Sequence, residues 1–326
     1  MTVANVVGPV PVTVIGGYLG AGKTTLVNHL LRERDGARIA VLVNDFGALS
    51  IDDDLIESID GTVMRLAGGC VCCSFGNDLV AALMELPRMQ PRPDHILIEA
   101  SGVALPGSVA RTLRLLPELV LDAVVVLADA QTMRERAADR YVGDTVLQQL
   151  VDADLIVLNK ADLVDAQALA GIAAWLDAVA PSARRVSAEH ARLPPAVLMG
   201  TGLAAERASA SHVSTMLAGP MAAPRPLQAR DVFDSISLEF AHPVDCAALA
   251  RSLAATELGL VRAKGLMRDL DGVPCSLQLV GARAVVAPSG HPRPDDGRLV
   301  CIGLRGQLDR GRIETLLDTA SRGAPP

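Results

Sequence analysis

The sequence predicts an α/β fold, a mostly parallel sheet covered by helices, followed by a smaller α+β domain. In the first half, short and nearly continuous apolar runs alternate with longer helical or loop stretches, as in parallel sheets buried on both faces. Between Ala191 and Arg230 the composition shifts to Ala, Pro, Ser and Gly, which predicts a helix or two and then a linker. From Asp231 polar and apolar residues alternate, which is typical of a sheet with one solvent-exposed face.

Five apolar runs predict the strands of the first domain: Val12–Ile15, Ile39–Val43, His95–Ile98, Ala123–Leu127 and Leu155–Leu158. A glycine-rich loop and a helix from about Thr24 to Arg34 follow the first run. We place this domain at 1–218, the linker at 219–230 and the second domain at 231–326. In the second domain we expect strands at Ser235–Phe240 and around Leu277, Val285 and Val300, and helices at about Asp245–Ala255 and Arg310–Thr319.

Composition excludes several classes of protein. The 326 residues include 30 Lys and Arg against 37 Asp and Glu, a net charge of −7, which argues against a nucleic-acid binder. One Trp, two Tyr and four Phe provide few stacking platforms for single strands. Half of the residues are apolar, so the chain can bury a core.

We expect no membrane segment and a cytoplasmic location. Met1–Gly22 has no charged residue, yet it lacks a basic leading region and is broken by Pro and Gly, unlike a signal peptide. Leu119–Ala128 is too short to span a bilayer and contains Asp122. Three of the six cysteines crowd into four positions, a spacing unsuited to structural disulfides, so a reducing compartment is expected.

A phosphate-binding loop is the strongest motif. Gly17–Thr24 matches G-x-x-x-x-G-K-[ST] between a predicted strand and a predicted helix, the context that the motif requires. Lys23 would reach the β- and γ-phosphates, and the Thr24 hydroxyl would bind Mg²⁺. The alternative is an ordinary glycine-rich turn that caps a helix. The expected nucleotide-binding residues of this loop are Gly17, Gly20, Ala21, Gly22, Lys23, Thr24 and Thr25.

Two further segments complete the predicted nucleotide site. Glu99 ends an apolar strand and would hold Mg²⁺ through water, and Gly102 would offer its N–H to the γ-phosphate. Asn159–Asp162 reads N-K-x-D, in which the Asp162 carboxylate only accepts hydrogen bonds and so suits the N1–H and 2-amino donors of guanine. Adenine lacks these donors, so we predict GTP rather than ATP.

Within the N-K-x-D motif, Asn159 would tether loops and Lys160 would stack along the base. Ser187 and Ala188 could complete the base pocket through backbone contacts.

A cysteine cluster predicts a metal site. Cys70, Cys72 and Cys73 could converge on Zn²⁺, Cu⁺ or a similar ion and leave a fourth position for an outside ligand. Inert buried cysteines or a redox pair are the alternatives. Asp45 follows the second strand, where a loop that senses the γ-phosphate would lie, and it could orient Mg²⁺ or ligate the metal. The other three cysteines, Cys246, Cys275 and Cys301, are expected to be small core residues.

Together these motifs resemble the CobW-like (cobalamin-synthesis-type) metallochaperone GTPases, relatives of the GTPases that serve urease and hydrogenase maturation. The resemblance runs in order through Gly16–Thr25, Val43–Gly47, Gly69–Cys73, Glu99–Gly102 and Asn159–Asp162, and continues in Val261–Gly265 and Val300–Gly303. Two departures matter. The family usually carries Glu where this chain has Asp45, and many members have a His-rich stretch where this chain has only His190 and His212.

The resemblance implies a GTPase domain and an enzyme that hydrolyses GTP to GDP and phosphate, with Lys23, Thr24, Asp45 and Glu99 as its catalytic residues. It also implies a transition metal held by the three clustered thiolates and delivered to a client metalloprotein. Zn²⁺ is favoured, with Co²⁺, Fe²⁺ and Ni²⁺ open. No obvious glutamine or arginine finger is present, so slow turnover is expected. A second copy of the chain, forming a homodimer, is a possible partner. The alternative functions are a non-enzymatic zinc-sensing adaptor with a structural nucleotide and an ATP-dependent small-molecule kinase.

Overall fold

The computed structural model describes residues 8–33, 36–43, 63–65, 77–199, 233–255, 258–289 and 297–322. The chain divides into two compact units, Met1–Gly200 with Val280–Arg283, and Thr201–Leu279 with Ala284–Pro326. The boundaries expected from the sequence, 218 and 230, both fall outside the described residues. They stay a prediction.

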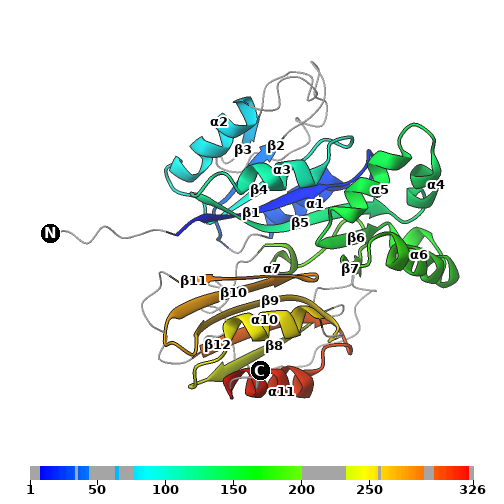
Figure 1. Ribbon diagram of the computed structural model, residues 1–326. Coiled ribbons are helices and arrows are strands. Elements are labelled where there is room, and N and C mark those ends of the chain that lie inside the picture. The colour runs from blue at the N-terminus through cyan, green and yellow to red at the C-terminus, as the bar shows by residue number, and fades with distance from the viewer. Residues whose placement is uncertain are drawn as a thin grey trace, which may run out of the picture. The chain divides into compact units, whose positions relative to one another are not determined.

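The first unit is built around a seven-stranded sheet with the strand order β3-β2-β4-β1-β5-β6-β7 (Figure 1). All six pairs of neighbouring strands are parallel, which confirms the predicted parallel sheet. The strands are β1 Val10–Gly16, β2 Ile39–Val43, β3 Val63–Arg65, β4 His95–Glu99, β5 Leu119–Asp129, β6 Leu155–Asn159 and β7 Arg184–Ser187. The residues of β2, β4 and β6 are all buried, as their continuous apolar runs predict.

Helices cover this sheet, as expected for the α/β class. Buried residues of α2, α3, α5 and α6 pack against alternate residues of the strands, and α1 buries Leu26, Val27, Leu30 and Leu31. The helices are α1 Lys23–Arg32, α2 Asn77–Glu85, α3 Pro106–Leu113, α4 Met133–Ala138, α5 Gly143–Val151, α6 Ala166–Val179 and α7 Pro195–Leu198, with 3-10 turns η2 Leu86–Arg88 and η3 Ala161–Leu163. The helix predicted at 24–34 is therefore α1, which begins one residue earlier.

The segment after β7 is fastened to the first unit by buried polar groups. The Thr13 hydroxyl donates to the Leu198 carbonyl at 3.0 Å, and its oxygen lies 2.8 Å from His95 Nε2. Because the single hydroxyl proton of Thr13 is used there, His95 Nε2 acts as the donor to Thr13. His29 Nε2 of α1 lies 3.0 Å from the Leu193 carbonyl. These contacts fix residues 193–198 against β1 and α1.

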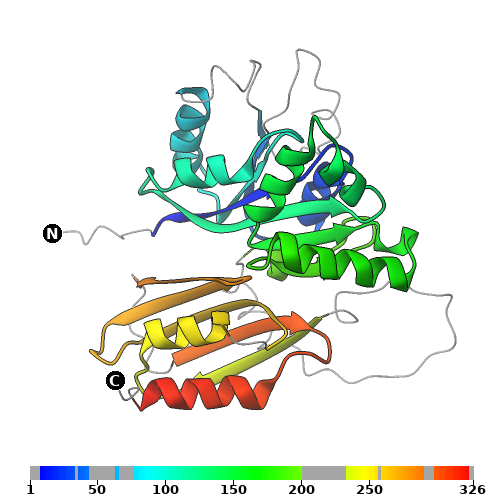
Figure 2. The same ribbon diagram turned by 45° about the vertical axis from the view of Figure 1, so that its right-hand side comes forward.

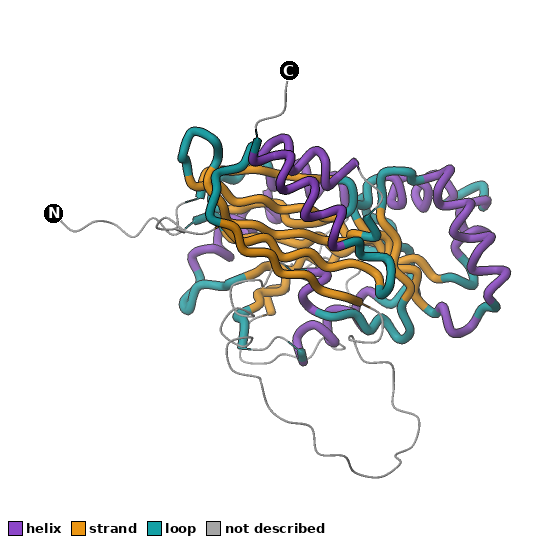
Figure 3. The backbone as a smooth tube through the Cα atoms, turned by 90° about the horizontal axis from the view of Figure 1, so that it is seen from below, coloured by secondary structure: helices purple, strands orange, loops and turns teal. Residues whose placement is uncertain are grey.

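The second unit contains a sheet whose strands lie side by side (orange in Figure 3). It has five strands in the order β11-β10-β9-β12-β8, and β12 pairs antiparallel with both β8 and β9. Helices α10 and α11 lie on one side of it (Figure 2), so the predicted α+β class is confirmed. The elements are β8 Phe233–Phe240, α10 Cys246–Ala255, β9 Leu260–Arg268, β10 Pro274–Val280, β11 Arg283–Pro288, β12 Gly297–Leu304 and α11 Arg310–Ser321.

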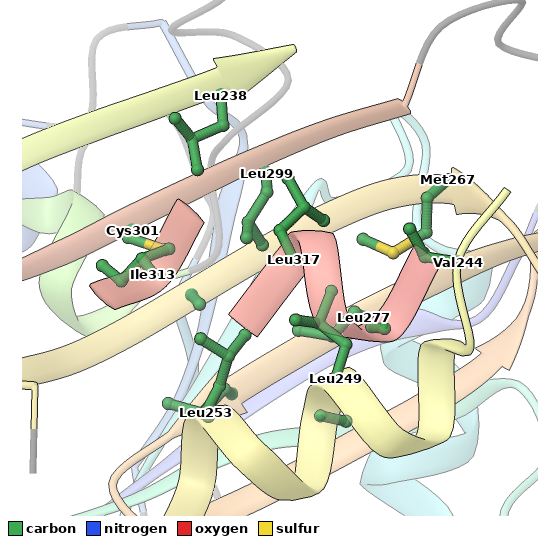
Figure 4. Packing of buried hydrophobic residues seen from close by; sticks show 14 of the residues in the cluster. Leu238, Val244, Leu249, Leu253, Met267, Leu277, Leu299, Cys301, Ile313 and Leu317 are labelled. Carbon is green, nitrogen blue, oxygen red and sulfur yellow. The ribbon is translucent and has the colours of Figure 1, made fainter. Parts of the chain in front are cut away.

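The core of the second unit lies between its two helices and its sheet. Leu249 and Leu253 of α10 and Leu317 of α11 point toward Leu277 and Leu299 of the strands (Figure 4). Alternate residues of β8 are buried, as its alternating pattern predicts.

The three cysteines of the second unit are buried and unpaired by disulfides, which confirms the interpretation of Cys246, Cys275 and Cys301 as core residues. Desolvation raises the pKa of Cys301 to about 12. Burial, together with the neighbouring Cys275 and Asp269, raises the pKa of the Cys246 thiol above its ordinary value. Both thiols therefore stay protonated at neutral pH and are poor nucleophiles.

Three strands were not predicted from the sequence. β3 is only three residues long, and β7 is a short edge strand that begins with Arg184 and Arg185. In β9, Arg262, Lys264 and Arg268 interrupt the apolar pattern, although Arg262 is only 2% exposed. Among the described residues, no helix is both long and apolar enough to cross a membrane.

Replacing Leu277, which is fully buried, by Ala is expected to destabilise the second unit by about 2–5 kcal/mol because it leaves a cavity. Hydrogen exchange in urea, followed by mass spectrometry of β9 and β12 peptides, measures this change. Fluorescence of Trp175, the one tryptophan of the chain, reports on α6 in the first unit. Leu270→Ala, at a side chain that is 48% exposed, is the control. Unchanged exchange of β9 and β12 in Leu277→Ala would contradict the packing.

Candidate nucleotide-binding site

The carboxyl ends of the parallel strands bring the predicted nucleotide residues to one edge of the first sheet. After β1 the chain builds β2, β3 and β4 on one side of it, and β5, β6 and β7 on the other. Ligands of open parallel sheets bind at such a change of direction, outside the carboxyl ends of the strands. The phosphate loop follows β1 at this place, with Glu99 at the end of one neighbouring strand and Asp129 at the end of the other.

The phosphate loop has the backbone that its glycines allow. Gly17 has φ +129°, and a Cβ there would lie 2.2 Å from the Leu127 carbonyl oxygen, so only glycine fits beside β5. Gly22, with φ +103°, caps α1 without a side-chain hydrogen bond. The first amides of α1 are not capped by that residue and can face an anion. The loop therefore has the features of a phosphate site.

Lys23, the first residue of α1, is 9% exposed. Its Nζ lies 3.5 Å from the Tyr18 carbonyl, so the ammonium group is held along the loop. Thr25, another residue expected to bind nucleotide, is exposed. A buried ammonium group held against this glycine-rich loop is suited to the charge of a triphosphate.

Thr24 and Glu99 are brought together. The Thr24 hydroxyl donates to Glu99 Oε1 at 2.8 Å, and Glu99 is 6% exposed. Glu99 is in register with Ile15 of β1 and Val43 of β2. Hydroxyl and carboxylate oxygens are ligands that Mg²⁺ prefers, so this pair fits a magnesium ion beside the phosphate loop.

Gly102 lies in a tight turn that packs on the phosphate loop. The Ala104 amide donates to the Ser101 carbonyl at 3.0 Å. A Cβ on Gly102 would lie 2.5 Å from Leu19 Cδ2 and 2.9 Å from the Leu19 nitrogen, so this approach requires glycine. Gln149 of α5, which the sequence did not single out, donates to the carbonyls of Gly102 and Ala104 at 3.0 and 2.8 Å. A Gln in a helix gives no sequence signal of such a contact.

Asn159 connects three segments of the site. Its Nδ2 donates to the Ala21 carbonyl of the phosphate loop at 2.9 Å, and its Oδ1 accepts from the Ala191 amide at 2.8 Å. The side chain is 3% exposed. Asn159 therefore tethers the loops, as the N-K-x-D motif predicts.

Lys160 and Asp162 follow at the end of β6. Lys160 adopts φ +59°, and its Nζ lies 2.6 Å from Asp129 Oδ2. Asp129 was not selected from the sequence. The signal was the same as for Glu99, since each is a carboxylate at the end of an apolar strand. Asp162 is exposed, so its carboxylate is accessible to the base of a nucleotide.

The strand end at β7 is joined to the base-reading motif. The Ala161 amide donates to the Ala188 carbonyl at 3.2 Å, and the Ala188 amide donates to the Leu158 carbonyl at 2.9 Å. Ser187 is exposed and pairs with Leu158 in the sheet. The structure therefore places Ser187 and Ala188 beside the loop that carries Asp162.

The predicted metal ligands Cys70, Cys72 and Cys73, and also Asp45, lie outside the described residues. Within the described parts of the chain, no group of three or more His, Cys, Asp or Glu could hold a metal ion. Asp45 follows β2 in the sequence and the three cysteines follow β3. The last residues of these strands, Val43 and Arg65, are paired at the carboxyl edge of the sheet.

Comparison with known proteins identifies a nucleotide-binding domain in the first unit and a separate C-terminal domain in the second. Among curated relatives, the zinc chaperone CobW of Sinorhizobium sp. is 33% identical over 315 residues, covering 85% of this chain and 86% of the relative. The zinc chaperone YjiA of Escherichia coli is 31% identical, covering 91% and 95%. The zinc-regulated GTPase metalloprotein activator 1 of Schizosaccharomyces pombe is 36% identical, covering 49% of this chain and 41% of the relative.

Two family models match, one described as the CobW/HypB/UreG nucleotide-binding domain over residues 11–187, the other as the cobalamin synthesis protein cobW C-terminal domain over residues 233–321. The chain therefore belongs to the CobW/HypB/UreG family of nucleotide-binding proteins and carries the cobW C-terminal domain.

Proposed function

We propose that this chain hydrolyses GTP and uses the nucleotide state to bind a transition metal, zinc above all, and deliver it to a client metalloprotein. The observation that carries the proposal is the Thr24–Glu99 contact of 2.8 Å beside a glycine-rich phosphate loop, with a base-reading motif on the same sheet edge. The names of the relatives, zinc chaperones and a zinc-regulated GTPase metalloprotein activator, support the choice of metal and reaction.

In the proposed hydrolysis, water attacks the γ-phosphorus and the bond to the β–γ bridging oxygen breaks, giving GDP and phosphate. The loop amides and the Lys23 ammonium group hold the phosphates, and the Gly102 amide donates to the γ-phosphate. Thr24 and Glu99 would hold Mg²⁺, and the bound ion would neutralise charge that develops on the phosphate oxygens. No glutamine or arginine finger stands out in the sequence, so we expect slow turnover without an activating partner.

Guanine selection is assigned to Asp162. Its carboxylate would accept from N1–H and the 2-amino group, whereas adenine would leave the charge without these donors. Lys160, held by Asp129, would lie along the base, and Asn159 keeps the phosphate loop at a fixed distance from this motif. This arrangement favours a GTPase over an ATP-dependent kinase.

The thiolates of Cys70, Cys72 and Cys73 are the proposed metal ligands. Four residues lie between Arg65 and Cys70, so the chain from one to the other spans at most about 18 Å when extended, and Asn77 begins α2 four residues after Cys73. Arg65 lies two strands from Glu99 in the sheet, about 10 Å at the usual strand spacing. The chain is thus long enough for the cysteines to reach the proposed γ-phosphate site, which supports the proposed coupling of metal and nucleotide.

In this proposal, loss of the γ-phosphate loosens the metal site and lets a client take the ion, with Asp45 contributing to Mg²⁺ or to the metal. Zinc is the first choice, and Co²⁺, Fe²⁺ and Ni²⁺ remain alternatives. The cytoplasmic setting and a homodimer stay predictions from the sequence.

Lys23→Ala is expected to lower kcat/KM for GTP by about 100-fold or more because it removes a cation from the transferred phosphoryl group. Phosphate release from the full chain in excess GTP and Mg²⁺ measures this effect. Arg88→Ala removes an exposed cation in η2 and should leave the rate unchanged. Wild type that binds nucleotide but releases no phosphate would favour the adaptor alternative, in which the nucleotide is structural.

Asp162→Asn is expected to weaken guanine-nucleotide binding about 10- to 100-fold, since hydrogen bonds to a charged group are lost. Xanthine nucleotides should bind the variant better than wild type, because the new amide can donate to the carbonyl that replaces the 2-amino group. Titration with fluorescent GDP and XDP measures both. Asp165→Asn is a matched control, since Asp165 caps α6 by accepting from the Ala168 amide. Guanine preference that survives in Asp162→Asn would refute this assignment.

Joint replacement of Cys70, Cys72 and Cys73 by Ser is expected to abolish high-affinity binding of about one Zn²⁺ per chain, because the thiolates are lost. In wild type, zinc affinity should differ about 5- to 150-fold between a non-hydrolysable GTP analogue and GDP. Competition with a chromophoric chelator measures both values. Cys301→Ala, at a thiol whose pKa burial raises to about 12, should keep full zinc binding. Equal zinc affinity in the two nucleotide states would rule out the delivery mechanism.

A further inference from the structure

The turn that carries Gly102 is held both by Gln149 of α5 and by its contact with Leu19 of the phosphate loop. The Gln149 side chain, 1% exposed, donates from Nε2 to both the Gly102 and the Ala104 carbonyls. Leu19 of the phosphate loop lies against Gly102 so closely that a Cβ there would be 2.5 Å from its side chain. The turn is therefore clamped between α5 and the phosphate loop.

Further hydrogen bonds fix both ends of this turn. The Ala100 amide donates to the Ile15 carbonyl at 2.8 Å, and Ala104 donates to Ser101 within the turn. Just beyond it, the Gly107 amide donates to Asp152 Oδ2 at 3.0 Å. Asp152 follows α5, so the end of one helix positions the whole stretch from Gly102 to the start of α3. The turn is therefore held at both ends by hydrogen bonds within the protein.

We propose that Gln149 is a positioning residue for nucleotide discrimination: it holds Gly102 ready for a γ-phosphate and thereby favours the triphosphate over the diphosphate. The inference rests on the proposed function, in which the Gly102 amide meets the γ-phosphate. Because contacts within the protein hold the turn, little conformational entropy is lost when the γ-phosphate binds. More of the interaction energy between the Gly102 amide and the γ-phosphate then contributes to the affinity. GDP has no phosphate at this position and gains nothing from the clamp.

Loss of the two hydrogen bonds that Gln149 donates should lower the affinity for the triphosphate and leave the affinity for the diphosphate unchanged. In Gln149→Leu, a side chain of similar size, neither carbonyl receives its hydrogen bond and the turn is free to adopt other arrangements. We expect affinity for a non-hydrolysable GTP analogue to fall about tenfold, while affinity for GDP changes by less than about twofold. Isothermal titration of the full chain with Mg²⁺ and each nucleotide measures the two values.

Gln148→Leu is the matched control. Gln148 is the exposed neighbour in the same helix and donates to Asp152 Oδ1 at 2.9 Å, so its replacement leaves in place the hydrogen bond from the Gly107 amide to Asp152 Oδ2. It should leave the ratio of the two affinities unchanged. Thermal unfolding with GDP, followed by Trp175 fluorescence, shows whether each variant is folded.

Gln149→Glu provides a second test if the Leu variant does not fold. An ionised carboxylate cannot donate to a carbonyl, whereas the protonated acid can donate once. Affinity of this variant for the GTP analogue should therefore rise as the pH falls, relative to wild type at the same pH, and affinity for GDP should follow wild type. A merely structural role of Gln149 would not produce this difference between the nucleotides.

The outcomes separate the inference from the proposed function. Wild type that binds neither nucleotide overturns the proposed function. If wild type binds both nucleotides, the role of Gln149 alone is overturned by either of two results for Gln149→Leu. The affinities for the GTP analogue and for GDP fall equally, or neither affinity falls. The role of Gln149 is also overturned if, in Gln149→Glu, the ratio of the affinities for the GTP analogue and GDP equals the wild-type ratio at every pH.

Discussion

The common direction of the seven strands in the first sheet is the constraint on which the candidate site depends. Since all neighbouring pairs are parallel, every strand ends at the same edge, and residues on neighbouring strands stand about 5 Å apart there. Glu99 thus comes to lie beside the phosphate loop without any sequence proximity to it. The chain must then return through helices, which bury the strands on both faces and place helix ends around the same edge. Burial of the strands and assembly of the site are two results of one topology.

Most of the first unit could be predicted because its strands are buried on both faces and therefore appear as uninterrupted apolar runs. The phosphate loop and the N-K-x-D motif were predictable because each requires specific residue types at fixed spacing. β7 and β9 could not be predicted, since charged residues such as Arg185 and Lys264 hide their pattern. Gln149 also escaped notice: whether a helical Gln faces solvent or a backbone carbonyl depends on tertiary packing, which one sequence does not contain.

Asn159 shows how one buried amide can organise several loops. It satisfies an acceptor of the phosphate loop at Ala21 and a donor at Ala191, so both of its ends are paired in a nearly dry environment. Buried polar groups with all partners in place fix a single arrangement, because any shift leaves an unpaired group at high cost. The phosphate loop, the base-reading motif and the segment after β7 are therefore positioned as one body. Gln149 plays a comparable part for the turn from Gly102 to Ala104.

The attachment of residues 191–198 has a consequence for how the chain can vary in length. Ala191, Leu193 and Leu198 each make a backbone hydrogen bond with a side chain of Asn159, His29 or Thr13. Deleting or inserting one residue between these anchors would shift at least one carbonyl or amide away from its partner, at the cost of a buried unsatisfied group. Changes in linker length between the two units are thus compatible with an intact nucleotide site only when they fall after this stretch.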